Sequence, residues 1–115
     1  MKLFSYSSCS TCRRAIKWLK SNDIVFELID ILEKPPSKEM LVYASDQYGD
    51  RKYLLNTSGV IYRSIGSEVV KKMSDDQLFE KLFIEPRLIK RPFLFKSNKC
   101  FLVGFKEEKW AEKLL

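Results

Sequence analysis

Two cysteines three positions apart, Cys9 and Cys12, carry the clearest chemistry in the sequence. Apolar residues recur at helical spacing over residues 13–20, so Cys9 is expected at the first turn of a helix and Cys12 one turn inside it. Unpaired backbone N–H groups and the helix dipole stabilise an anion there, and Arg13 and Arg14 add positive charge. Because the thiolate is the reactive form of cysteine, the pattern predicts a redox pair in which Cys9 attacks and Cys12 resolves.

Two other uses of this cysteine pair remain open at this point. A structural zinc site needs further ligands, but the chain has no histidine and its remaining cysteine is Cys100. Two inert structural cysteines are the second alternative, although inert cysteines are typically buried and not flanked by arginines at a helix start. We predict no metal and no bound cofactor. Cys100, inside a predicted strand, is expected to be a small buried hydrophobic residue.

The composition is that of an ordinary globular protein. The chain has 115 residues, of which 45% are hydrophobic and 31% charged, and no apolar run approaches a membrane span. We expect one domain over residues 1–115, a monomer, and no membrane association. The N-terminus lacks signal-peptide architecture, which predicts a cytoplasmic protein with reduced thiols. The net charge is +6, but the basic residues are dispersed, so we predict a solvated basic surface without direct nucleic-acid contact.

The N-terminal part of the chain is predicted to be a strand–helix–strand unit. The strands are expected over residues 2–6 and 24–30, and the helix over residues 10–21. The second strand is almost continuously apolar, which is typical of a parallel strand buried on both faces. Such a unit is a βαβ motif.

A largely helical insert, residues 35–86, follows the βαβ motif. The helices expected first within it cover residues 38–48, 51–55 and 60–65. A further helix begins after Ser74, which forms a capping box with Gln77. The apolar residues that this helix is expected to bury are Leu78, Leu82 and Phe83.

The C-terminal part is predicted to be a hairpin and a last helix. The strands are expected over residues 91–95 and 99–103 around a turn at Ser97 and Asn98, and the helix over residues 105–115. The whole order is therefore βαβ, a helical insert, and ββα. It predicts an α/β thioredoxin-like, glutaredoxin-like fold with a mixed four-stranded sheet.

The chain resembles the arsenate reductase (ArsC) family in its wide sense, which includes glutaredoxin-like reductases and Spx-type transcription regulators. The resemblance extends over nearly the whole chain and rests on five segments in the family's order and spacing. These segments are Cys9-Ser-Thr-Cys12-Arg-Arg-Ala, Leu55-Asn-Thr-Ser-Gly59 with Tyr62-Arg63, Ser74-Asp-Asp-Gln-Leu78, Leu88-Ile-Lys-Arg-Pro92 and Leu102-Val-Gly-Phe105. The family's fold is thioredoxin-like, in agreement with the predicted order of elements.

The resemblance implies roles for several residues. Cys9 matches the catalytic cysteine of the reductases and, with Cys12, the redox switch of the regulators. Arg91 matches the arginine before the family's cis-proline, Pro92, and would favour the Cys9 thiolate and grip an oxyanion. The residues expected to contact substrate are Ser10, Thr11, Asn56 and Pro92. Asn56 has an alternative interpretation as a turn-forming residue.

Two positions depart from the family's arsenate reductases, which place two further arginines around the anion. Here Asn56 stands at the first position and Gly104 at the second. A hydrogen bond to a charged group contributes about 1.5–3 kcal/mol, so losing both predicts weak arsenate binding unless Arg63 or Arg13 replaces the charge. Efficient arsenate reduction is therefore not expected.

Two functions remain as predictions. The first is a thiol–disulfide oxidoreductase that acts on a disulfide substrate or redox protein and takes electrons from glutathione, glutaredoxin or thioredoxin. The second, implied by the resemblance, is a redox-sensing regulator of the Spx type that binds the alpha subunit of RNA polymerase through the helical insert. Gly49 lies near the glycine that those regulators use for this contact. They usually have longer basic C-terminal tails than this chain, which ends directly after its predicted last helix.

Overall fold

The computed structural model describes residues 1–97 and 99–115. A four-stranded sheet forms its centre, with the strand order β2-β1-β3-β4. The strands are β1 (Lys2–Ser5), β2 (Glu27–Asp30), β3 (Phe93–Ser97) and β4 (Cys100–Val103). β1 and β2 are parallel, whereas β3 is antiparallel to both β1 and β4, so the predicted mixed sheet is confirmed.

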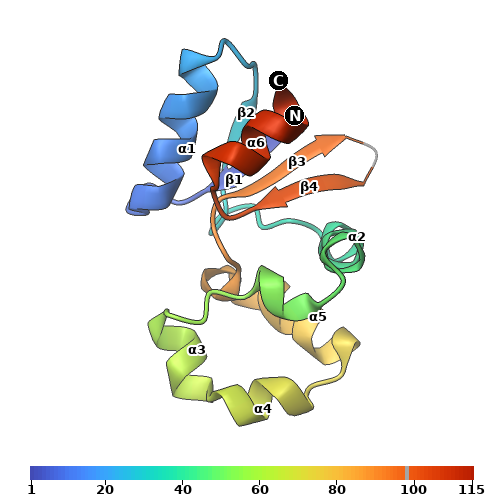
Figure 1. Cartoon of the computed structure of the whole chain (residues 1–115). Helices are drawn as coiled ribbons and strands as arrows, with labels where there is room; N and C mark the ends of the chain where they lie inside the picture. The colour runs from blue at the N-terminus through green and yellow to red at the C-terminus, as the bar shows by residue number, and fades with distance from the viewer. Residues whose placement is uncertain (98) are drawn as a thin grey trace.

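Helices lie on both faces of the sheet, and a further group of helices extends away from it (Figure 1). The helices are α1 (Ser10–Ser21), α2 (Lys38–Tyr48), α3 (Val60–Ile65), α4 (Ser67–Lys72), α5 (Asp75–Ile84) and α6 (Glu107–Leu114), with short 3-10 helices at Arg51–Leu54 and Pro86–Leu88. α1 and α6 pack on one face of the sheet, and α2 packs on the other. No helix within the described residues has the length and apolar character to cross a lipid bilayer.

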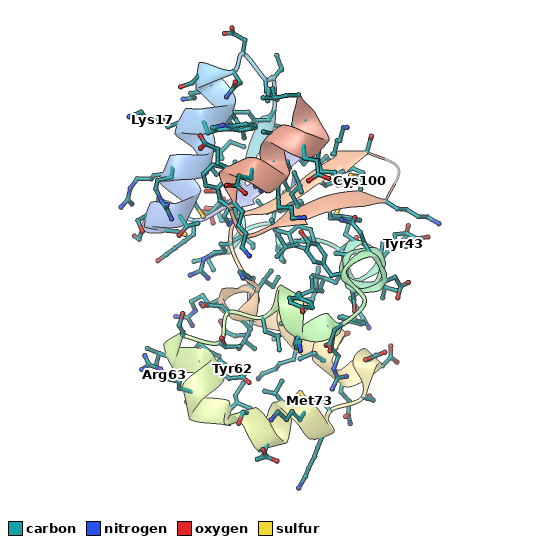
Figure 2. All side chains as sticks on the ribbon, viewed as in Figure 1. Lys17, Tyr43, Tyr62, Arg63, Met73 and Cys100 are labelled. Atoms are coloured by element: carbon teal, nitrogen blue, oxygen red, sulfur yellow. The ribbon has the colours of Figure 1, made fainter. Side chains whose placement is uncertain are left out.

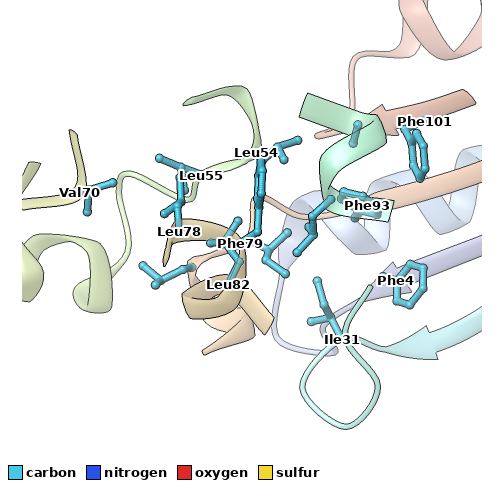
Figure 3. Packing of buried hydrophobic residues seen from close by; sticks show 14 residues of the cluster. Phe4, Ile31, Leu54, Leu55, Val70, Leu78, Phe79, Leu82, Phe93 and Phe101 are labelled. Carbon is cyan, nitrogen blue, oxygen red and sulfur yellow. The ribbon is translucent and has the colours of Figure 1, made fainter. Parts of the chain in front are cut away.

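The alternation of side chains along β1 divides the core into two clusters. Leu3 joins the cluster beneath α1 and α6, while Phe4 joins the cluster on the opposite face. The second cluster continues from Phe93 on the sheet through Leu54 to Leu82 in the insert (Figure 3). The insert is therefore held to the sheet by shared apolar burial.

A capping box begins α5, as the sequence predicts. The Ser74 hydroxyl accepts a hydrogen bond from the Gln77 N–H at 3.1 Å, and the Ser74 N–H donates to Gln77 Oε1 at 2.9 Å. We expect Ser74→Ala to lower the free energy of unfolding by about 1 kcal/mol, because the Gln77 N–H at the start of the helix loses its side-chain acceptor. Urea unfolding measures the loss. Ser67→Ala is the control, since α4 has no side-chain cap, and an equal loss there would contradict the prediction.

Three details of the prediction were wrong. The strand expected over residues 24–30 is shorter and lies at the edge of the sheet, so Val25 is 89% exposed and Leu28 58% exposed. Phe83 is 43% exposed, and the buried side of α5 consists of Leu78, Phe79 and Leu82 instead. Cys100 is only partly buried, since it lies at the start of the β4 edge strand. The predicted turn falls partly on Asn98, outside the described residues.

Side chains of α2 cover the outer edge of β4. The Gln47 amide both accepts from the Phe101 N–H and donates to the Phe101 carbonyl, each at 2.7 Å. The Tyr48 hydroxyl accepts from the Val103 N–H at 2.8 Å. These contacts fix the position of α2 against the sheet and satisfy backbone groups that β3 does not reach.

Candidate redox site

Cys9 lies where the loop after β1 enters α1. It is the N-cap residue of α1, with extended backbone angles, and its Sγ accepts a hydrogen bond from the Cys12 N–H at 3.3 Å. The Cys9 N–H donates to the Tyr6 carbonyl at 3.0 Å, which closes the loop. The sulfur therefore takes the position that a serine or aspartate oxygen occupies in an ordinary helix cap. Backbone donors and the helix dipole both favour negative charge there.

The two sulfurs have opposite surroundings. Burial raises the pKa of Cys9, but hydrogen bonds from Cys12 and the hydrogen bonding and charge of Arg91 outweigh it, so the Cys9 pKa is lowered. Burial, the hydrogen bond to Cys9 and the charge of its thiolate raise the pKa of Cys12 to about 11. Cys12 is fully buried, and Cys9 is partly exposed. Cys9 is the sulfur that ionises first.

Arg91 and Pro92 lie between the insert and β3. The Arg91–Pro92 peptide bond is cis, as the resemblance implies. The Arg91 guanidinium lies 5.4 Å from the Tyr6 ring centroid, and its Nη1 donates to the Arg87 carbonyl at 3.2 Å. Its Nε is buried and has no hydrogen-bond partner among the described residues. Arg91 thus keeps one buried donor without a partner in the described part of the chain, while its hydrogen bonding and charge act on Cys9.

A groove of about 560 Å³ opens at Cys9. The predicted site residues that line it are Cys9, Ser10, Thr11, Asn56 and Arg91. Cys12 and Pro92 are buried behind its wall and do not line it. Asn56 also serves the fold, since its amide donates to the Arg87 carbonyl at 3.3 Å. Asn56 therefore lies in the wall of the groove and also ties that wall to the segment around Arg87.

The sequence interpretation missed two cationic residues of the groove, Lys90 and Lys106. They line it together with Arg91 and with Arg14, whose charge near Cys9 was expected. Neither of the arginines considered as replacements for the missing charges is there: Arg63 lies on α3 among the helices of the insert (Figure 2), and the Arg13 guanidinium donates to the Ser7 carbonyl. The only sequence signal for Lys90 was its position directly before Arg91. Nothing local identifies Lys106, which the fold brings in after β4.

We expect Arg91→Met to raise the pKa of Cys9 towards the ordinary cysteine value of about 8.5, because the variant removes a positive charge and a donor. The pH dependence of Cys9 alkylation measures the pKa. An unchanged profile would show that the helix terminus alone sets it.

The same pKa shifts make folding stability depend on pH. The folded pKa of Cys9 is depressed, so its contribution to stability is present above the unfolded pKa and is lost as the pH falls through the folded value. The folded pKa of Cys12 is raised, so its contribution is present below the unfolded pKa and is lost as the pH rises through about 11. Urea unfolding across this range checks both signs.

The fold and the site together define the class of protein: a thioredoxin-like chain with a Cys-x-x-Cys pair at the start of its first helix and a cis-proline nearby. The chain belongs to the ArsC family, whose model matches residues 4–113. This match confirms the resemblance drawn from the five sequence segments.

Three relatives illustrate the range of this family. The YusI protein of Bacillus subtilis, described as uncharacterized, is 40% identical over 114 residues, which cover 97% of this chain and 96% of YusI. The global transcriptional regulator Spx of Streptococcus mutans is 29% identical over 107 residues, which cover 92% of this chain and 77% of Spx. The structure of a possible arsenate reductase from Streptococcus mutans UA159 has a TM-score of 0.86 at 30% identity, with 96% of each chain covered.

Proposed function

We propose that the protein is a thiol–disulfide oxidoreductase in which Cys9 is the nucleophile and Cys12 the resolving cysteine. One observation carries the proposal: two neighbouring sulfurs have pKa values displaced in opposite directions, and only the more acidic one reaches the groove. An attacking thiol must be accessible and ionised, whereas a resolving thiol must be close and held back until it is needed. Cys9 and Cys12 meet these two requirements.

In the first step the Cys9 thiolate attacks one sulfur of a substrate disulfide. A new disulfide forms between Cys9 and that sulfur, and the second substrate sulfur leaves as a thiolate that takes a proton from solvent. Arg91 stabilises the Cys9 thiolate before attack through its hydrogen bonding and its positive charge. Pro92 shapes the backbone beside the groove, and Ser10, Thr11 and Asn56 contact the substrate.

In the second step Cys12 attacks Cys9 and releases the first substrate sulfur. The negative charge of Cys9 disappears when the mixed disulfide forms, so one cause of the raised Cys12 pKa disappears with it. The Tyr6 backbone and the Ser5 side chain, which both lower that pKa, stay in place. Cys12 therefore becomes more acidic at the moment when its thiolate is required. The product is a Cys9–Cys12 disulfide and two substrate thiols.

An external thiol must then reduce the Cys9–Cys12 disulfide. Glutathione, glutaredoxin or thioredoxin can supply the two electrons, and no bound cofactor takes part in the proposed cycle. Such a cycle belongs in the cytoplasm, because thiols are held reduced there.

The test combines a potential and a turnover measurement. The Cys9–Cys12 disulfide is equilibrated with glutathione buffers, and a reduction potential within the cytosolic range of about −220 to −320 mV is expected. Reduction of hydroxyethyl disulfide, a small neutral substrate, is followed in parallel with a thiol donor. A disulfide that does not form, or an enzyme that does not turn over, would overturn the proposal.

A second function, a redox-sensing regulator, is favoured by the similarity to Spx over 92% of this chain. In that case the Cys9–Cys12 disulfide is a switch, and the insert that carries Gly49 at the end of α2 would contact the RNA polymerase alpha subunit. Binding of purified alpha subunit to the reduced and oxidised chain distinguishes the two functions. Redox-dependent binding without disulfide turnover would favour the regulator.

A further inference from the structure

A second cavity of about 300 Å³ adjoins the Cys9 groove. The two hollows share Lys90, Val103, Gly104 and Lys106 in their walls, so they meet along the end of β4 and the turn into α6. Cys9 lies in the first hollow and not in the second. We call these two adjoining hollows together the double groove, and the reactive sulfur of Cys9 lies in the first of them.

Gly104 lies at the boundary between the two hollows and leaves room there for the Lys90 side chain. Its φ is +73°, a conformation that favours glycine. A Cβ at this position would lie 2.9 Å from Lys90 Cε, so any larger residue would displace the Lys90 side chain. Because position 104 carries no side chain, the stem of Lys90 lies across the boundary and its charge serves both hollows.

The double groove has a single sign of charge. The cationic residues that line it are Arg14, Lys90, Arg91, Lys106, Lys109 and Lys113. Within residues 1–97 and 99–115, no aspartate or glutamate lines either hollow. Lys109 lies 4.0 Å from Glu112, an exposed pair that neutralises little of this charge. A concave surface of one sign concentrates ligands of the opposite sign and raises their association rate.

The second hollow also offers aromatic surface of fixed shape. Tyr53 is 48% exposed, and its ring lies 6.1 Å from the Tyr48 ring. Tyr48 is held by its hydrogen bond to Val103, and Trp110 is held by its indole N–H, which donates to the Gly104 carbonyl at 3.0 Å. Tyr53 is the exposed ring of this hollow, whereas the partly buried Tyr48 and the buried Trp110 form the fixed wall beside it. An exposed tyrosine on a fixed wall is a typical anchor for a polypeptide partner. A small oxyanion would leave this hollow unused.

We propose that the substrate of the redox pair is an acidic polypeptide whose cysteine is held in a disulfide. Its sulfur occupies the Cys9 hollow, and its flanking carboxylates and an apolar side chain occupy the second hollow over Tyr53. This inference rests on the proposed oxidoreductase function and names its substrate class. Cys9 attacks the polypeptide sulfur and forms a mixed disulfide with it, and the other sulfur of the substrate leaves as a thiol. Cys12 then attacks Cys9, forms the Cys9–Cys12 disulfide and releases the polypeptide as a thiol. The reduced pair supplies both electrons.

The test uses two synthetic peptides that differ only in charge. One carries glutamates on both sides of a single cysteine, the other carries glutamines, and each cysteine is joined to neutral mercaptoethanol in a disulfide. Pre-reduced protein is mixed with each peptide at low salt. The rate at which the Cys9–Cys12 pair of the protein is oxidised is followed by acid quench and mass spectrometry. We expect the glutamate peptide to react about tenfold faster or more, and the advantage to fall steeply as salt shortens the screening length from about 30 Å to about 8 Å.

Two variants locate the effect. The double variant Lys109→Gln/Lys113→Gln and the single variant Tyr53→Ala change only the second hollow, and each is expected to reduce the preference for the glutamate peptide severalfold. Lys72→Gln, at the end of α4 outside the double groove, is the matched control and should leave the preference unchanged.

Hydroxyethyl disulfide separates the two proposals. If it oxidises the protein while the two peptides react equally, the substrate class proposed here is overturned and the oxidoreductase function stands. If it does not react at all, the oxidoreductase function itself fails. The peptide reaction is also tested for inhibition by oligo(dT) and by polyglutamate. Inhibition by oligo(dT) at concentrations where polyglutamate has no effect would overturn the proposal of a polypeptide substrate and would indicate that the double groove binds a nucleic acid.

Discussion

Replacing Cys9 by serine is expected to reduce disulfide turnover by roughly a thousandfold or more, within the range seen when a covalent nucleophile is removed. A serine hydroxyl does not ionise at this helix terminus, so the first attack cannot occur. Turnover of hydroxyethyl disulfide measures the loss. Cys12→Ser should behave differently, because Cys9 can still attack. That variant should accumulate a mixed disulfide, visible as an added mass, without releasing the bound sulfur.

Cys100 provides the control for this experiment. It is the remaining cysteine of the chain, and Figure 2 places it on the β3–β4 hairpin, away from the start of α1. Cys100→Ser should retain the turnover of the unmodified chain. Turnover that survives Cys9→Ser but is lost in Cys100→Ser would move the nucleophile to the hairpin and contradict the proposed function.

Replacing Trp110 by alanine is expected to cause the largest loss of stability, about 3–5 kcal/mol. The side chain is 1% exposed and packs edge-on against Phe105 and Trp18, with ring centroids 5.0 and 6.3 Å away. Alanine would leave a cavity between α6 and the sheet, and the Gly104 carbonyl would lose the hydrogen bond from the indole N–H. Urea unfolding measures the change, and Trp18 remains as the fluorescent probe.

Two further variants interpret the result. Trp110→Phe keeps most of the ring but loses the hydrogen bond to Gly104, so it should cost less than the alanine variant. Val25→Ala, at a side chain that is 89% exposed, should stay within about 0.5 kcal/mol of the unmodified chain. A loss at Trp110→Ala no greater than that at Val25→Ala would show that α6 does not contribute to the folded core.

Much of the local structure could be predicted because short-range chemistry determines it. The helix after Cys9 and the capping box at Ser74 each depend on residues within one turn of each other, and both were located correctly. The parallel pairing of β1 and β2 follows from the βαβ order. The cis bond before Pro92 was different, since only the family resemblance implied it and no local pattern requires it.

The errors arose where the answer depends on distant parts of the chain. The apolar residues around Leu28 indicated a strand buried on both faces. In the structure β2 is an edge strand and Leu28 is 58% exposed. The prediction was wrong because hydropathy does not report the position of a strand in its sheet. Two cationic residues near Cys9, Lys90 and Lys106, were missed for the same reason. Cys9 and Lys106 lie near opposite ends of the sequence, and Lys106 reaches the groove because it directly follows the β3–β4 hairpin.

The contacts of Gln47 with β4 have a consequence for how the molecule meets its neighbours. A strand at the edge of a sheet normally presents free N–H and C=O groups, on which a strand of another molecule can add and start aggregation. Here the primary amide of Gln47 imitates a peptide group, and the Tyr48 hydroxyl occupies the next donor along. The edge of β4 is thereby closed to a fifth strand by side chains of the same chain.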